Sequence, residues 1–296
     1  MSETVQNASI EVTFQELLAK SKKKMTIGIV LLICGIAALV AGIISLPPVF
    51  FIVGTVLVIA GLVFANLGKS AIRKFAAEKL VPAALNSVMD DVQYEPDGRL
   101  GNSIIRTDMG FPFSFDEISG NDHICGNYRG MQVEMSDVKL VEVRVVHTKN
   151  GTTTQRVTVF QGPWIVCDFG KDLVCDLLLS ERTALGKLAT VGGIKTESEE
   201  FNKRFFIRCL SEHDAFYLLT PHMMERILEM DDRTNGDSYL RFQANGKVIL
   251  ALNCHKNFFE PDFSAKKVED LQKKYENEIK HLLGLLDTLR LAESME

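Results

Sequence analysis

The sequence predicts an α+β protein: an N-terminal two-helix transmembrane hairpin, then a largely antiparallel β-sheet cytosolic domain with flanking helices and a C-terminal helix. Three observations predict this. Residues 25–68 contain no Asp, Glu, Lys, Arg or His. Two Asn-Gly dipeptides, Asn150-Gly151 and Asn245-Gly246, separate segments rich in β-formers, which is typical of β-hairpins. Residues 264–291 repeat apolar side chains every three or four positions, as an amphipathic helix does.

The uncharged run divides at Pro47-Pro48, because successive prolines remove backbone donors and disfavour helix before them. Its halves, residues 25–46 and 49–67, would rise about 33 and 28 Å as helices, close to a hydrocarbon core of about 30 Å. A secretory signal peptide is the alternative, but the apolar run is too long and a second span follows it directly. We therefore expect a transmembrane hairpin over residues 25–67.

Basic residues flank the hairpin on both sides. Cytoplasmic segments next to membrane spans carry an excess of lysine and arginine. Four lysines precede the first span and three basic residues follow the second: Lys20, Lys22, Lys23, Lys24, Lys69, Arg73 and Lys74. We expect a multi-pass protein of the cell membrane with both termini cytoplasmic and the lipid bilayer as its first partner.

Small residues recur along both spans at intervals close to two helical turns, so each span presents one stripe of them. Such stripes let helix backbones approach in lipid. The predicted packing residues are Gly28, Gly35, Ala38, Gly42, Gly54, Gly61, Ala65 and Gly68. The two stripes either face each other within one hairpin, which we favour, or form contacts between copies in a homo-oligomer.

The segments beside the hairpin also have helical patterns. Residues 1–24 are expected to form a cytosolic amphipathic segment, whose helix starts at a capping box over Thr13-Phe14-Gln15-Glu16. Residues 68–93 are alanine-rich and are expected to form a neck helix that continues the second span until Pro82 bends or interrupts it.

Residues 94–263 are expected to form the cytosolic α+β domain. Strands are predicted over residues 131–147, 152–169, 239–244 and 247–252, and helices over residues 197–203 and 221–230, the second starting at Pro221. Hairpins joined in this way make an antiparallel sheet, and not the parallel sheet of nucleotide-binding folds.

Residues 264–296 are expected to form a C-terminal helix. Its apolar positions resemble a coiled-coil seam: Val268, Leu271, Tyr275, Leu282, Leu286 and Leu289. We favour packing on its own domain, because Glu278 occupies one seam position and Leu283 and Leu285 widen the apolar face.

The net charge and the cysteine content argue against two classes of protein, those that bind nucleic acid and those that are secreted and stabilised by disulfides. The net charge of −5 argues against nucleic acid as a partner, since phosphate binding needs a clustered basic face. The six cysteines are scattered and lack the dense spacing of a disulfide-stapled secreted module, so we expect reduced thiols and a cytosolic domain.

No catalytic, cofactor-binding or metal-binding residues are predicted. Gly68-Lys69-Ser70 lacks the first glycine of a phosphate-binding loop. His123-Ile124-Cys125 and Cys254-His255 offer soft ligands, but adjacent strand residues point to opposite faces and no CxxC spacing accompanies them. His222 and Glu225 lie on one helix face, where a surface pair is the favoured interpretation.

Several local motifs follow one another in a characteristic order, at residues 118–123, 126–130, 159–164, 168–171, 200–203, 217–221, 224–226 and 258–261. They resemble the motifs of a prokaryotic membrane family catalogued as domain of unknown function family 3137. The resemblance implies a shared architecture, and it supplies no catalytic residues because the family has no established activity.

Three functions remain open at this stage. We favour a noncatalytic, membrane-anchored interaction or scaffold protein that contacts other membrane or cytosolic proteins, because the spans carry no Asp, Glu, Lys, Arg or His that could form a transport pathway. A ligand or lipid sensor with a pocket between the sheet and the neck helix is the second. An enzyme is the third.

Overall fold

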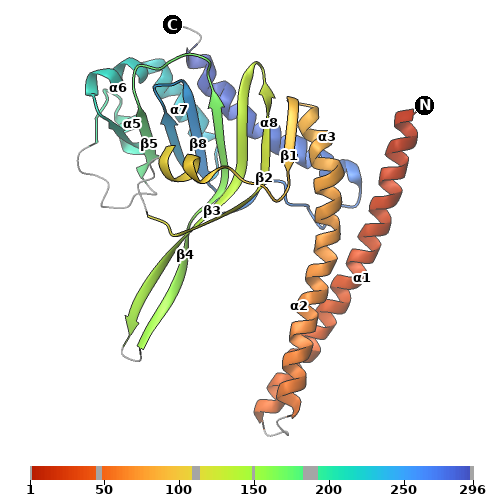
Figure 1. Cartoon of the computed structure of the whole chain (residues 1–296). Helices are drawn as coiled ribbons and strands as arrows, with labels where there is room; N and C mark the ends of the chain where they lie inside the picture. Colours follow the sequence, from red (N-terminus) through yellow and green to blue (C-terminus); the bar gives the residue numbers. More distant parts are fainter. Residues whose placement is uncertain (1, 45–48, 109–113, 149–150, 183–192, 294–296) are drawn as a thin grey trace. The chain divides into compact units, whose positions relative to one another are not determined.

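The computed structural model describes residues 2–44, 49–108, 114–148, 151–182 and 193–293 (Figure 1). They divide into two compact units. The first contains Met1–Ala84 and Glu260–Glu276, and the second contains Leu85–Phe259 and Asn277–Glu296. Two apolar N-terminal helices, one antiparallel sheet, further helices and a C-terminal helix confirm the predicted α+β class.

Helices α1 (Ser2–Ile44) and α2 (Val49–Phe75) dominate the first unit and run side by side (Figure 1). Both are long and apolar enough to cross a membrane. Their outer faces expose large apolar side chains such as Ile33, Ile43 and Ile52. Exposing so extensive an apolar surface to water is unfavourable, whereas lipid solvates it.

The N-terminal helix differs from the prediction. A helix was expected to start at Thr13, but α1 already runs through this position from Ser2, so the capping-box interpretation is wrong. Neither proline nor glycine interrupts residues 2–27. Phe14 is buried and stacks on Phe75 with ring centroids 5.9 Å apart, and this packing supports an uninterrupted helix.

The neck helix ends earlier than predicted. The π-helical segment η1 (Ala76–Leu80) and the short helix α3 (Val81–Asn86) follow α2, and residues Asp90–Glu95 then form strand β1 instead of helix. Pro82 lacks a backbone N–H, so the regular hydrogen-bond ladder cannot continue through it, and a π-helical turn precedes it.

The second unit is built on one eight-stranded sheet in the order β1-β2-β3-β4-β8-β7-β5-β6, with every neighbouring pair antiparallel. The remaining strands are β2 (Glu117–Tyr128), β3 (Met131–Thr148), β4 (Gly151–Asp168), β5 (Leu177–Glu181), β6 (Phe205–Cys209), β7 (Asp237–Phe242) and β8 (Lys247–Asn253). The helical elements are η2 (Ile104–Asp108), α5 (Glu199–Arg204), α6 (Glu212–Leu218), α7 (Pro221–Asp232) and α8 (Val268–Glu293).

The predicted local signals mostly lie where expected. Gly246 has a φ of 84° in the turn between β7 and β8, a conformation that favours glycine. Helix α7 starts at Pro221, and the Thr220 side chain accepts a hydrogen bond from the Met223 N–H as its N-cap. The β3–β4 pair is also present, although Asn150 of its turn lies outside the described residues.

The apolar positions of α8 are buried within the chain, including all six of the predicted seam. Glu278, the polar residue on this face, accepts a hydrogen bond from the Phe259 N–H at 3.0 Å. Tyr128 of β2 donates a hydrogen bond to Asp287 of α8 at 2.7 Å. These contacts favour the interpretation that the helix packs on its own chain.

The sheet also carries an apolar core around Trp164, Phe160 and Tyr239. Leu100 and Ile105, from the connection between β1 and β2, complete this core. The Phe160 ring lies 5.4 Å from Trp164 and 6.3 Å from Tyr239 in edge-to-face geometry. Such aromatic contacts add to the free energy gained by burial.

We predict that Phe160→Ala destabilises the sheet by about 3–5 kcal/mol, because the buried ring would leave a cavity. Denaturation of the full chain in detergent micelles, followed by the fluorescence of Trp164, measures the change. The control is Val174→Ala, whose side chain is exposed and which should change the free energy by about 0.5 kcal/mol or less. Equal midpoints for both variants would contradict this assignment of the core.

Candidate functional site

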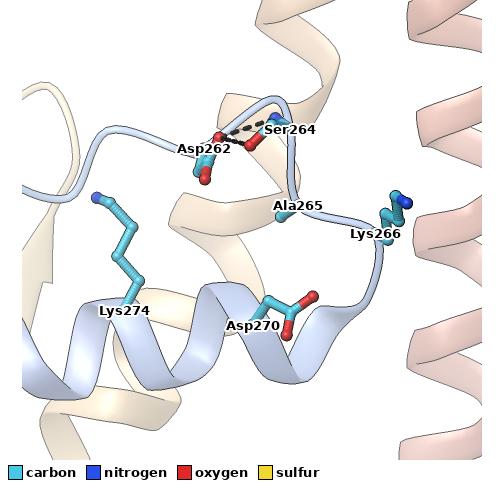
Figure 2. A pocket seen from close by; sticks show the side chains of 6 residues that line it. All are labelled: Asp262, Ser264, Ala265, Lys266, Asp270 and Lys274. Atoms are coloured by element: carbon cyan, nitrogen blue, oxygen red, sulfur yellow. Dashed lines mark hydrogen bonds between the residues drawn. The ribbon is translucent and has the colours of Figure 1, made fainter.

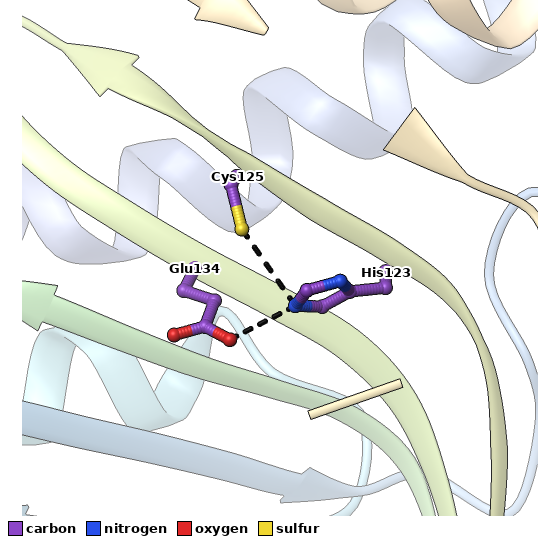
Figure 3. Close-up of side chains that lie close together, drawn as sticks. All are labelled: His123, Cys125 and Glu134. Atoms are coloured by element: carbon purple, nitrogen blue, oxygen red, sulfur yellow. Dashed lines mark hydrogen bonds and ion pairs between the residues drawn. The ribbon is translucent and has the colours of Figure 1, made fainter. Parts of the chain in front are cut away.

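Three potential metal ligands converge on one face of the sheet: His123 and Cys125 of β2 and Glu134 of β3 (Figure 3). Their ligand atoms all lie within 4.8 Å of one another. His123 Nε2 is 2.9 Å from Glu134 Oε1 and 3.6 Å from Cys125 Sγ. The group therefore offers a nitrogen, a sulfur and an oxygen to one point in space.

The turn between β2 and β3 sets the register that brings these residues together. Arg129 and Gly130 both have positive φ, 49° and 79°, as a two-residue type I′ hairpin turn requires. Tyr128 then pairs with Met131, and three residues further along each strand Cys125 pairs with Glu134. Residues 123 and 125 share a face because side chains alternate along a strand.

A β-bulge fixes the position of His123. The register of β2 shifts between Asn121 and Ile124, and Asp122 inside the shift has a φ of 57°. Asp122 is buried, and its carboxylate accepts hydrogen bonds from the Tyr94 hydroxyl and the Asn121 side-chain amide. The backbone N–H of Asp122 donates a hydrogen bond to Pro96 O at 2.9 Å. Bulges of this kind often orient a functional side chain.

The electrostatic surroundings of the cluster are acidic. Glu95 of β1 pairs with His123, and its Oε2 lies 3.9 Å from His123 Nδ1. Burial, and then the charges of Glu134 and Glu95, raise the pKa of the Cys125 thiol, which is therefore neutral at physiological pH. The imidazole thus lies between two carboxylates, one at each ring nitrogen.

A small cavity of about 120 Å³ adjoins the cluster. Cys125 and Glu134 form part of its wall. The other lining residues come from β3, β4 and β8: Gln132, Val133, Val166, Cys167, Asp168 and Lys247. Ligand pockets for drug-sized molecules are about 300–1,000 Å³. This space suits an ion with water, and not a metabolite.

The other predicted candidates do not assemble into a site among the described residues. Cys254 contacts backbone oxygens of Gln161 and Lys256, and no described His, Cys, Asp or Glu forms a ligand group with it. His222 is half-buried and Glu225 is exposed. Within the described part of α7 an ion pair joins Arg226 to Glu229 instead. Gly68 belongs to helix α2, so its neighbours Lys69 and Ser70 form no phosphate loop.

A hollow of about 420 Å³ in the first unit is polar and shallow (Figure 2). Asp262 accepts hydrogen bonds from the N–H and hydroxyl of Ser264, which lower the pKa of its carboxyl. Lys274 donates to Glu260 O at 2.7 Å. These groups already stabilise the turn before α8, so the hollow presents no convergent ligand set.

The predicted glycine stripes lie between α1 and α2. A Cβ added at Gly28 or Gly61 would lie 2.8 Å from backbone of the other helix, and one at Gly35 or Gly54 would be equally close to the facing helix. Only glycine fits at this separation. Sequence reasoning missed Ser21, whose buried hydroxyl donates to Gly68 O at 2.6 Å and ties the two helices together.

Comparison with known proteins agrees with the motifs. Residues 158–291 match the family described as Protein of unknown function (DUF3137). This confirms the predicted resemblance. No curated protein and no solved structure matches the chain.

The DUF3137 match begins within β4 and extends along the chain through the strands that follow it and most of α8. It includes the motifs from Val159 to Pro261, whereas those at residues 118–123 and 126–130 precede it. The three-ligand cluster therefore lies outside the DUF3137 match, on strands that pair with it through β3 and β4.

We predict that Gly61→Leu forces α1 and α2 apart, because no space exists for a side chain there. Spin labels at the exposed positions Ile33 and Val63, in a cysteine-depleted chain, should report a distance about 2 Å longer, as larger contact residues widen helix packing. The control is Thr55→Leu, which places the same leucine on an exposed face of α2 and should leave the distance unchanged. If the distance between the two labels were unchanged in Gly61→Leu, the glycine stripe would not form the contact between α1 and α2.

Proposed function

We propose that this chain is a membrane-anchored interaction protein that recruits a protein partner through the distal part of its β3–β4 hairpin. The hairpin of α1 and α2 is the anchor in this proposal. Both termini and the sheet unit lie in the cytoplasm, as the basic residues beside the helices favour. The proposal assigns no catalysis to the chain.

The observation that carries the proposal is the extent of β3 and β4 beyond the sheet. Residues 142–148 and 151–157, here called the arm, pair only with each other among the described strands. The arm projects from the sheet as a two-stranded ribbon (Figure 1). Two-stranded ribbons are marginally stable in water, so a long one is expected to gain stability from a partner.

A bulge separates the arm from the sheet. The β3–β4 register shifts between Leu140 and Val141, and Asp116 holds the junction by accepting a hydrogen bond from the Val143 N–H at 2.7 Å. Beyond this point Val145 and Val146 are largely exposed, at 59% and 41%. Exposed β-branched residues beside unpaired strand edges are the conditions under which another chain adds a strand.

Both arginines of the arm are paired with a glutamate: Arg144 pairs with Glu142 at 2.6 Å and Arg156 pairs with Glu117 at 3.0 Å. The described part of the arm therefore offers a partner its strand edges and exposed valines, and not unpaired charge. The sensor alternative has weaker support, because the lining of the hollow of about 530 Å³ beside α5 consists, among the described residues, of charged side chains: Glu181, Glu199, Glu200, Lys203 and Arg204.

Photo-crosslinkable residues placed at Val146 and at Thr153 test the proposal in native membranes. These two positions pair across the arm, and we expect each to yield the same discrete crosslinked protein. The matched control is Val174, which is exposed at 60% but lies outside the arm. A doubled chain mass would identify the partner as a second copy.

Charge at the arm should weaken this contact. Val145→Lys with Val146→Lys is expected to reduce crosslinking from Thr153 at least about tenfold, because lysine blocks strand addition at an open edge. The proposal would be contradicted if neither arm position gave a crosslink, or if position 174 gave the same crosslinked protein as the arm positions.

A further inference from the structure

We propose that His123, Cys125 and Glu134 bind a borderline-soft divalent cation, with Zn²⁺ as the best fit, and leave one coordination position open toward the adjoining cavity. This site goes beyond the proposed interaction role and does not depend on it. The sequence predicted no metal site, because the third ligand is supplied only by strand pairing.

The ligand set selects the class of ion. Thiolate, imidazole and carboxylate together are typical of zinc, whereas calcium and magnesium prefer oxygen alone. In a tetrahedral zinc site with bonds of about 2.0–2.3 Å, ligand atoms lie about 3.3–3.7 Å apart. The sulfur–nitrogen distance of 3.6 Å already fits, and the oxygen–nitrogen distance of 2.9 Å needs to open by only a few tenths of an ångström.

The position of Glu95 is compatible with such a site, and its side chain is 73% exposed and its carboxylate lies beyond hydrogen-bond distance of the ring. Metal-binding histidines commonly direct their other ring nitrogen toward a carboxylate, which fixes the tautomer and the ring orientation. With Nε2 directed at Cys125 and Glu134, the second ring nitrogen, Nδ1, faces Glu95 at 3.9 Å. Glu95 is a positioning residue in this arrangement and does not itself enter the ligand group.

The surroundings hold the ligands in place. Cys125 and Glu134 are directly paired across two strands, whereas His123 lies in the bulge beside Asp122 and pairs with Glu95 of β1 on its other side. The His123 side chain is 20% exposed and that of Glu134 is 35% exposed, which leaves a path for the ion. The fourth position faces the cavity of about 120 Å³, where water or a partner's side chain fits.

Titration of the full chain in detergent micelles with Co²⁺ tests the site, since cobalt reports thiolate coordination by a charge-transfer absorption. We expect one equivalent to produce this band, with release of the Cys125 thiol proton to solvent. Cys125→Ser should abolish the band, and His123→Gln should abolish tight binding. Glu95→Gln should keep the band but weaken binding by about 10- to 100-fold, because it acts on the ligand's orientation.

Cys254→Ser and His255→Gln are the matched controls, because they remove the other Cys-His pair, which has no third ligand among the described residues. Both should bind Co²⁺ as the wild type does. Trp164 emission verifies that each variant is folded. A band absent from the wild type, retained in Cys125→Ser or lost in Cys254→Ser would overturn the proposal.

A measurement on the unmodified protein covers the case in which a variant fails to fold. Zn²⁺ should slow alkylation of Cys125 at least about tenfold, measured by mass spectrometry of the modified peptides, and should leave alkylation of Cys254 unchanged, because a bound thiolate is withdrawn from the reagent. Equal rates at Cys125 with and without Zn²⁺ would contradict the site.

Discussion

The fold depends first on the 44 residues, 25–68, that contain no Asp, Glu, Lys, Arg or His. Such a segment has to satisfy its backbone internally and keep its apolar surface from water, and two helices side by side do both. The glycines decide how closely the helices approach, because lipid provides no hydrophobic force between them and only close contact yields dispersion energy. The Ser21 hydroxyl adds one buried hydrogen bond at the end of this contact.

The second constraint is the register of the β2–β3 hairpin. A turn of two residues at Arg129 and Gly130 fixes the pairing of every residue up to the bulge at Asp122. A slip by one residue would turn the Glu134 side chain to the opposite face and destroy the ligand cluster. The same strand β3 continues beyond the sheet into the arm, so one strand connects the proposed cation site with the proposed partner surface.

Much of the fold was predictable from local patterns. The Pro47-Pro48 break, the Asn245-Gly246 turn and the proline start of α7 each have a local physical cause, and the structure has elements where they indicated them. The errors at Thr13 and at residues 87–93 arose where tertiary context competes with local signals. Phe14 packs on Phe75, and β1 pairs with β2, and neither contact is visible in a single sequence.

The candidate site was less predictable, because its third ligand lies nine residues beyond Cys125 and on another strand. His123 and Cys125 were recognised as soft ligands but were set aside because adjacent strand residues point to opposite faces and no CxxC spacing was present. The first argument was wrong for this pair, since residues two apart on a strand share a face. Treating Arg129-Gly130 as a two-residue turn would have paired Cys125 with Glu134 directly. The contribution of Glu95 depends on strand β1, most of which was predicted to be helix.

The central proposal is that the helical hairpin crosses the membrane and leaves the sheet unit in the cytoplasm. Single cysteines at Ser45, between the two helices, and at Thr153, exposed on the arm, test it in a cysteine-depleted chain. A membrane-impermeant thiol reagent applied to sealed cells should label position 45, and should reach position 153 only after the cells are opened. Labelling of position 153 in sealed cells would contradict the account.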